Sequence, residues 1–94
     1  MGMAFTWSYA ALASLMGIEP HEVRQALQGS WPRLGHSPDL SLTAVTFWGR
    51  TDTGRALLVA TRRVGARDWE IVGARDLTPA ELAELEQWEA DRNG

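Results

Sequence analysis

Residues 42–76 read LTAVTFWGRTDTGRALLVATRRVGARDWEIVGARD, and the expected fold class follows from this segment. It contains three runs rich in β-branched, aromatic and leucine residues, separated by two short segments of turn-forming residues. Short turns of this kind join antiparallel neighbours. The stretch therefore predicts a three-stranded meander, with strands over Leu42–Arg50, Arg55–Val64 and Trp69–Arg75 and turns over Thr51–Gly54 and Gly65–Asp68.

Two short helices are expected before the meander. Apolar residues crowd from Tyr9 to Met16 after Ser8, which suits a helix N-cap, and Gly17 suits the left-handed turn that ends a helix. A second helix begins at Pro20 and keeps helical spacing of its apolar residues until the next glycine.

The segments around these helices are less regular. Phe5–Trp7 is expected as an added edge strand. Ser30–Asp39 contains two prolines and a glycine and has no periodicity, so it is expected to be a connecting loop.

A last helix is expected from Pro79 to Ala90. Thr78 and Glu81 have the spacing of a capping box, and an apolar stripe follows. The expected architecture is an α+β single domain over residues 1–94, with two N-terminal helices, a three- to four-stranded antiparallel meander sheet and a C-terminal helix. The helices are expected to form one layer on the sheet, which leaves its opposite face partly free.

Composition excludes several classes of protein. The chain has 94 residues, 45% of them hydrophobic, and no cysteine, which excludes a disulfide scaffold and a thiolate metal site. The two histidines are isolated in the sequence and too few for a histidine metal site, so neither a metal nor a cofactor is expected. The apolar stretch near the N-terminus lacks the basic start of a secretory signal and the length of a membrane span, so we expect a cytoplasmic protein without membrane contact.

The net charge of −3 hides an uneven distribution. All nine cations are arginines, and six of them lie between residues 48 and 76, where the local charge is +2. Residues 77–94 carry −4. The basic middle and the acidic end predict a lopsided molecule.

The arginines of the middle segment are the main candidates for chemistry. Arg50 and Arg55 flank the first turn and are expected to lie close together across it, with Asp52 able to supply an intervening acid. Arg75 is expected to share a strand face with Trp69, Ile71 and Gly73, whereas Arg62 and Arg63 point to opposite faces. Two interpretations stay open: solvated arginines in surface ion pairs, or arginines that converge on a phosphate-binding surface.

Two further residues could contribute to binding. His36 lies in the expected loop and could act as a general acid or base. Trp48 is expected on the same strand face as Arg50 and is the best candidate for stacking on a nucleic-acid base, since Trp69 and Trp88 fall on apolar stripes.

The chain resembles the BrnT family of toxins in a series of short motifs. These are Phe5-Thr6-Trp7-Ser8, Leu15-Met16-Gly17-Ile18, Gly49-Arg50, Gly54-Arg55, Ile71-Val72-Gly73-Ala74-Arg75 and Thr78-Pro79-Ala80-Glu81. The resemblance implies a RelE-like fold and a metal-independent ribonuclease that arrests translation. It also implies neutralisation by a small ribbon-helix-helix antitoxin. It places Arg75 at the family's strand-terminal arginine and Arg50 and Arg55 at its hairpin arginines, and we expect these three residues to be catalytic. RNA would be bound with help from Arg62, Arg63, Trp48 and His36.

Two other functions remain open. A non-catalytic module could use its free sheet face and its arginines to bind an acidic or helical segment of a partner protein, and homodimerisation is also open. The pair of helices before the meander also has the spacing of a helix-turn-helix, but Glu19 and Glu22 would face DNA phosphates and be repelled.

Overall fold

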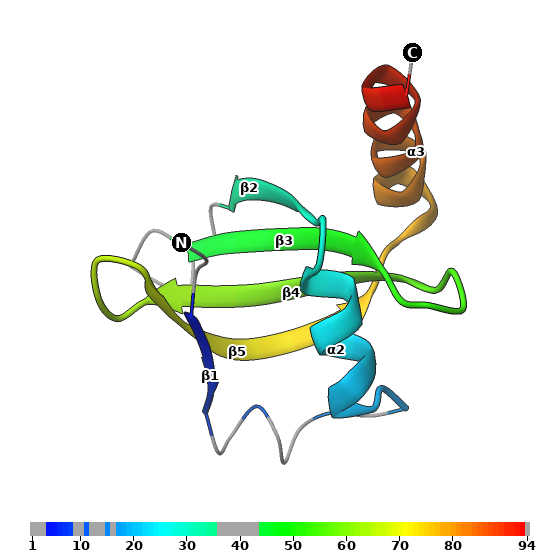
Figure 1. Cartoon of the computed structure of the whole chain (residues 1–94). Coiled ribbons are helices and arrows are strands. Elements are labelled where there is room, and N and C mark those ends of the chain that lie inside the picture. The colour runs from blue at the N-terminus through cyan, green and yellow to red at the C-terminus, as the bar shows by residue number, and fades with distance from the viewer. Residues whose placement is uncertain (1–3, 9–10, 12–14, 16, 36–43, 94) are drawn as a thin grey trace.

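The computed structural model describes residues 4–8, 11, 15, 17–35 and 44–93. Its elements are β1 (Ala4–Trp7), α2 (Pro20–Leu27), β2 (Trp31–Gly35), β3 (Ala44–Arg50), β4 (Ala56–Arg63), β5 (Asp68–Asp76) and α3 (Pro79–Asn93). Figure 1 shows their arrangement. The α+β class, the meander and the last helix are confirmed. Within the described part of the chain, no helix is long and apolar enough to cross a membrane.

The expected helix over Tyr9–Met16 lies largely outside the described residues. Its predicted N-cap is nevertheless engaged, because Ser8 Oγ accepts a hydrogen bond from the Ala11 amide at 3.0 Å. Gly17 has a φ of 72°, as expected for a residue in the left-handed region.

Over the described residues, the sheet has five strands in the order β1-β5-β4-β3-β2, more than the three or four expected. The predicted edge strand is present as β1, but it pairs in parallel with β5, with Phe5 opposite Trp69. The expectation of an all-antiparallel sheet is therefore wrong. A local pattern identifies a strand, but the partner and direction of β1 depend on residues from the other end of the chain.

The strand β2 is a second correction, because the sequence predicted a loop there. It pairs antiparallel with β3, with Trp31 opposite Trp48. Pro32 concealed the strand, since proline has no amide to donate and is confined within sheets to edges and bulges. The edge position of β2 accommodates it. Residues 36–39 of the predicted loop lie outside the described residues.

The helix α2 covers one face of the sheet, here called the α2 face (Figure 1). Its Val23 and Ala26 are 0% exposed and pack on the main core, which contains Phe47, Leu57, Val59 and Ile71. Gly49 permits this close approach, because a Cβ there would lie 1.9 Å from the Ala26 carbonyl oxygen.

The opposite face, here called the α3 face, carries a smaller cluster. Its buried members are Trp48, Leu58 and Leu85, with Trp31 and Trp88 packed against them. Alternate side chains of a strand point to opposite faces, so a single apolar run in β4 serves both clusters. The expectation of helices on one face only is therefore wrong.

The helix α3 begins at the predicted capping box. The Thr78 amide lies 2.9 Å from Glu81 Oε1, and the Glu81 amide lies 3.2 Å from Thr78 Oγ1. The helix then rises away from the end of the sheet (Figure 1). Only part of its length packs on the strands, which differs from the expected layer.

A bulge interrupts the alternation of β5. Consecutive residues of β4 pair with Ile71 and Gly73, so Val72 is an extra residue. The expectation that Trp69, Ile71, Gly73 and Arg75 share a face is therefore wrong, because a bulge shifts the alternation by one residue. Ile71 belongs to the α2 face, whereas Arg75 pairs with a leucine of the α3 face.

Candidate nucleic-acid interface

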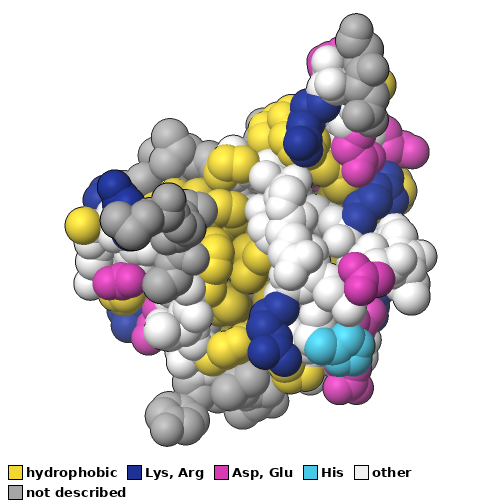
Figure 2. All heavy atoms as spheres, viewed as in Figure 1, with side chains coloured by type: hydrophobic (Ala, Val, Ile, Leu, Met, Phe, Trp, Pro, Cys, Tyr) yellow, Lys and Arg dark blue, Asp and Glu magenta, His cyan; other side chains and the backbone are white. Residues whose placement is uncertain are grey.

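The three arginines predicted to act in catalysis lie at the same end of the sheet. Arg50 ends β3, Arg55 directly precedes β4, and Arg75 is the penultimate residue of β5. Their side chains are 33%, 31% and 51% exposed, in that order. Each binds a carboxylate of this chain, and Figure 2 shows side chains of both signs next to one another at this end of the molecule.

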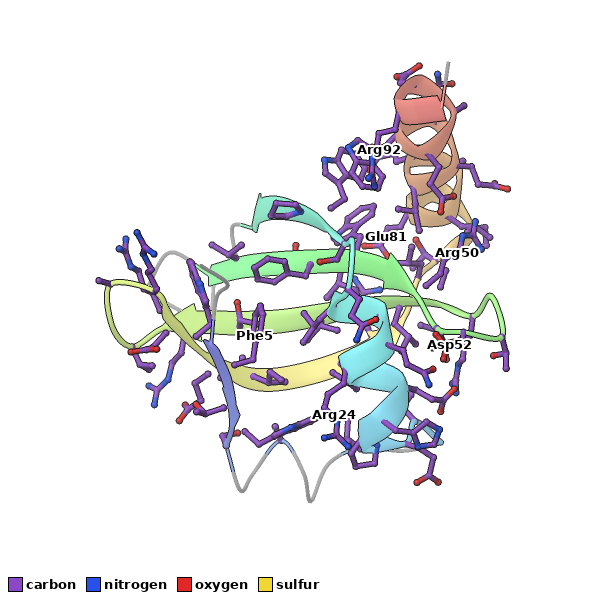
Figure 3. The ribbon with its side chains drawn as sticks, in the orientation of Figure 1. Phe5, Arg24, Arg50, Asp52, Glu81 and Arg92 are labelled. Atoms are coloured by element: carbon purple, nitrogen blue, oxygen red, sulfur yellow. The ribbon has the colours of Figure 1, made fainter. Side chains whose placement is uncertain are left out.

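Arg50 points toward α3 (Figure 3). Its Nε lies 2.9 Å from Glu89 Oε2, its Nη2 lies 3.1 Å from Glu89 Oε1, and its Nη1 donates to the Gly54 carbonyl at 3.0 Å. The hydrogen bonds to Glu89 raise the pKa of Arg50. The carboxylate that neutralises Arg50 is therefore supplied by α3 and not by Asp52 of the turn.

Arg75 binds the first turn of α3. Its Nη1 and Nη2 lie 2.6 and 2.8 Å from the two carboxylate oxygens of Glu81, in a bidentate arrangement. Hydrogen bonding to Arg75, assisted by the Thr78 amide, lowers the pKa of Glu81 to about 2. Glu81 therefore stays ionised at cellular pH, where it anchors Arg75 and is a poor proton acceptor.

Arg55 reaches the α2 face instead. Its Nε and Nη2 lie 2.8 and 3.0 Å from the Asp76 carboxylate, and its Nη1 donates to the Gly17 carbonyl at 2.8 Å and contacts Glu22 at 3.3 Å. Hydrogen bonding to Arg55 lowers the pKa of Asp76. The guanidinium groups of Arg50 and Arg55 therefore bind different elements, and the expected juxtaposition across the turn does not occur.

Arg62 and Arg63, predicted to bind RNA, lie at the other end of β4. Arg62 Nε binds Glu70 Oε1 at 2.7 Å, and Arg63 donates to the carbonyls of Gly65 and Ala66 at 2.9 and 2.8 Å. At about 3.3 Å per residue, they are roughly 20 Å from the start of the strand. The predicted arginines therefore form two groups at opposite ends of the sheet.

Trp48, the predicted stacking residue, is 6% exposed. Its ring meets Trp31 edge-on at 5.6 Å, and its Nε1 donates to Thr46 Oγ1 at 3.1 Å. The indole therefore belongs to the core of the α3 face and has no open ring face for a base. His36 lies outside the described residues.

A hollow of about 510 Å³ opens between the end of α2, the end of β3 and α3, and is here called the α2–α3 hollow. Its polar lining comes from Gln28, Arg50, Glu89 and Arg92, and Trp88 adds an apolar wall. Arg50 thus belongs both to the arginine group at the sheet end and to this hollow.

Arg92 and the carboxylate partner of Arg50, Glu89, were not predicted from the sequence. A signal was available, since Leu85, Glu89 and Arg92 follow one another at the three- and four-residue spacings that place side chains on one helix face. Leu85 lies on the predicted apolar stripe, so Glu89 and Arg92 could have been placed beside the sheet.

The arginine group can bind anions. A guanidinium offers five N–H groups, and in Arg75 the Nε makes no hydrogen bond with the described residues. Known proteins add no constraint: no family model matches this chain, and neither a curated protein nor a solved structure matches it.

Proposed function

We propose that this protein is a ribonuclease toxin of the BrnT type with a RelE-like fold, acting on RNA in the cytoplasm and neutralised by a small antitoxin. One observation carries the proposal: Arg50 and Arg75 lie on the same face at the same end of the sheet, and carboxylates of α3 hold both guanidinium groups in place. Two strand spacings, about 10 Å, separate their strands. Two guanidinium groups spaced in this way suit successive phosphates of an extended RNA strand.

The proposed reaction is a metal-independent transesterification. The ribose 2′ oxygen forms a bond to the adjacent phosphorus while the bond from phosphorus to the 5′ oxygen breaks. Water takes the 2′ proton and supplies the proton that the 5′ oxygen gains. Negative charge builds on the non-bridging oxygens of the scissile phosphate, where Arg75 stabilises it by charge-assisted hydrogen bonds, and Arg50 holds the neighbouring phosphate.

Arg55 has a different role in this proposal. It lies on the α2 face and binds Asp76, the residue next to Arg75. We assign it the structural task of joining β5 to α2. Arg62 and Arg63 are too distant for the same phosphate and can only bind RNA farther along its path.

A non-catalytic protein-binding module is the second candidate. The specific observation in its favour is that carboxylates of this chain already neutralise Arg50, Arg55 and Arg75. An acidic segment of a partner protein would supply carboxylates in place of the carboxylates that these arginines already bind. RNA would instead have to displace those carboxylates with phosphates.

Induced expression distinguishes the two candidates. The ribonuclease proposal expects the wild type to arrest growth and the purified protein to cleave single-stranded RNA. Arg75→Ala should reduce cleavage about 100-fold, the usual effect of removing one charge-stabilising group. Arg67→Ala, which changes an exposed arginine of the β4–β5 turn, is the matched control. A wild type that neither slows growth nor cleaves RNA, or an Arg75→Ala variant as active as the control, contradicts the proposal.

A further inference from the structure

The α2–α3 hollow lies at the end of a stack of flat side chains. The rings of Trp31 and Trp88 stack with 5.3 Å between centroids and 8° between planes. The guanidinium carbon of Arg92 lies 4.4 Å from the centre of the Trp88 ring. Trp88 thus contacts both Trp31 and Arg92, and Figure 3 shows Arg92 beside α3. Trp88 and Arg92 both line the hollow.

Arg92 differs from the arginines at the sheet end in its partners. Its contacts with the described residues are the Trp88 ring and a hydrogen bond of 3.3 Å from Nη1 to the Gly29 carbonyl, and no carboxylate among them pairs with it. These two contacts hold the group in place and leave its charge available. A cation with a fixed, flat outer surface is suited to an aromatic ligand that carries negative charge.

We propose that the α2–α3 hollow is a subsite for one unpaired nucleotide of RNA, an inference that rests on the ribonuclease function proposed above. The base stacks on the outer face of the Arg92 guanidinium, as bases do on arginine planes in single-stranded RNA recognition. The Gln28 amide binds the edge of the base, and the phosphate of the same nucleotide reaches Arg50. The volume of about 510 Å³ lies within the usual range for small-ligand pockets.

Because Arg50 lines the hollow, the subsite is continuous with the proposed cleavage site. An RNA strand would run from Arg75 across the sheet end to Arg50 and place its next base against Arg92. The hollow would then choose which nucleotide is placed beside the scissile phosphate.

Binding of RNA octamers that cannot be cleaved tests the subsite. The probes are fluorescein-labelled 2′-O-methyl oligo(A) and oligo(U), which lack the attacking hydroxyl, and the dissociation constants come from fluorescence anisotropy at one fixed salt concentration. Arg92→Gln removes charge and stacking, and Arg92→Lys keeps the charge but removes the planar group. Both should weaken oligo(A) binding about tenfold, the typical effect of losing one stacked base.

Two further variants complete the design. Arg67→Gln, which removes one positive charge from the other end of the sheet, should change affinity by less than about twofold. Gln28→Glu, a change at an exposed position, should weaken both octamers by repelling the phosphate. This variant decides the outcome if the Arg92 variants do not fold.

The outcomes separate the subsite from the function. If the wild type arrests growth and cleaves RNA but Arg92→Lys binds both octamers as tightly as the wild type, the subsite is wrong and the ribonuclease function stands. Equal losses of octamer affinity in Arg92→Gln and Arg67→Gln also overturn the subsite, because a general charge effect would then explain both losses. A wild type that binds neither octamer refutes the proposed function, and the subsite with it.

Discussion

Each face of the sheet carries a strand glycine, and the two glycines have opposite surroundings. On the α2 face, a Cβ on Gly49 would lie 1.9 Å from the Ala26 carbonyl oxygen. On the α3 face, a Cβ on Gly73 would meet no atom within 4 Å. The α2 helix is thus pressed against the strands, whereas part of the α3 face stays open.

The two helices are also held to the sheet by different kinds of contact. The helix α2 is held by fully buried aliphatic residues such as Val23 and Leu57. The helix α3 has one fully buried anchor, Leu85, and is otherwise held by the tryptophan stack and by ion pairs to the sheet arginines. Stability is therefore concentrated on the α2 face, and the proposed RNA chemistry on the α3 face.

The largest contrast in stability between the two faces is expected from Gly49→Ala and its control. The added methyl group meets backbone of α2, which cannot move aside as a flexible side chain could, so we expect a loss of about 3 kcal/mol or more in the free energy of unfolding. Gly73→Ala is the matched control and should change stability by less than about 1 kcal/mol. Urea denaturation of both variants measures the difference. Similar losses in the two proteins would show that the two faces are packed alike.

Truncating one buried leucine on each face should separate global from local stability. Leu57→Ala should lower the free energy of unfolding by about 3–5 kcal/mol, because it opens a cavity in the main core. Leu85→Ala should cost about 2–3 kcal/mol, since α3 can partly collapse onto the gap. Hydrogen exchange should show faster exchange of α3 amides in Leu85→Ala than of amides in β3–β5. Uniform acceleration along the chain would contradict the separate docking of α3.

A third pair of variants compares arginines on the two faces. Arg75→Gln should lower RNA cleavage about 100-fold and change the urea midpoint little. Arg55→Gln should lower the urea midpoint more, because it releases α2 and β5 together, and should leave cleavage within about threefold of the wild type. Single-turnover cleavage at saturating protein measures activity independently of binding. The opposite pattern would move the proposed site to the α2 face.

The smallest effect concerns the ion pair between Arg75 and Glu81. The pKa of Glu81 in the folded protein is lowered to about 2, so ionised Glu81 adds stability above its ordinary pKa and loses that contribution as the pH falls from about 4.5 to 2. Glu81→Gln keeps the capping geometry and removes the charge. At pH 7 the variant should be about 1 kcal/mol less stable than the wild type.

The pH dependence of this difference is the decisive measurement. Urea titrations between pH 7 and pH 2 should bring the stabilities of wild type and Glu81→Gln together. A difference that stays constant over this range would mean that the pair contributes nothing through its charge.

Local patterns predicted the parts of the fold that depend on nearby residues. The meander followed from short turns between apolar runs, and the start of α3 from the spacing of Thr78 and Glu81. The strand β2 and the parallel pairing of β1 were not predicted. Both depend on partners that are distant in the sequence, and Pro32 additionally resembles a loop residue.

The candidate site was predicted in its residues more than in its geometry. The concentration of arginines between residues 48 and 76 identified Arg50, Arg55 and Arg75. The face of each could not be read from alternation alone, because the bulge at Val72 places Arg75 on the side of Arg50. The role of Arg92 in the hollow could not be predicted either, since it requires α2 and α3 to meet.

The strands of the meander, the last helix and the concentration of arginines can be read from local sequence patterns, because turn chemistry, capping and charge act over a few residues. The face that each arginine occupies and the carboxylate that it binds depend on tertiary contacts. Strand pairing and one extra residue in β5 set those faces. The carboxylates come from elements that only folding brings to each arginine: α3 for Arg50 and Arg75, and β5 and α2 for Arg55. The acidic end of the chain, which lowers the net charge to −3, is thereby brought beside the basic end of the sheet.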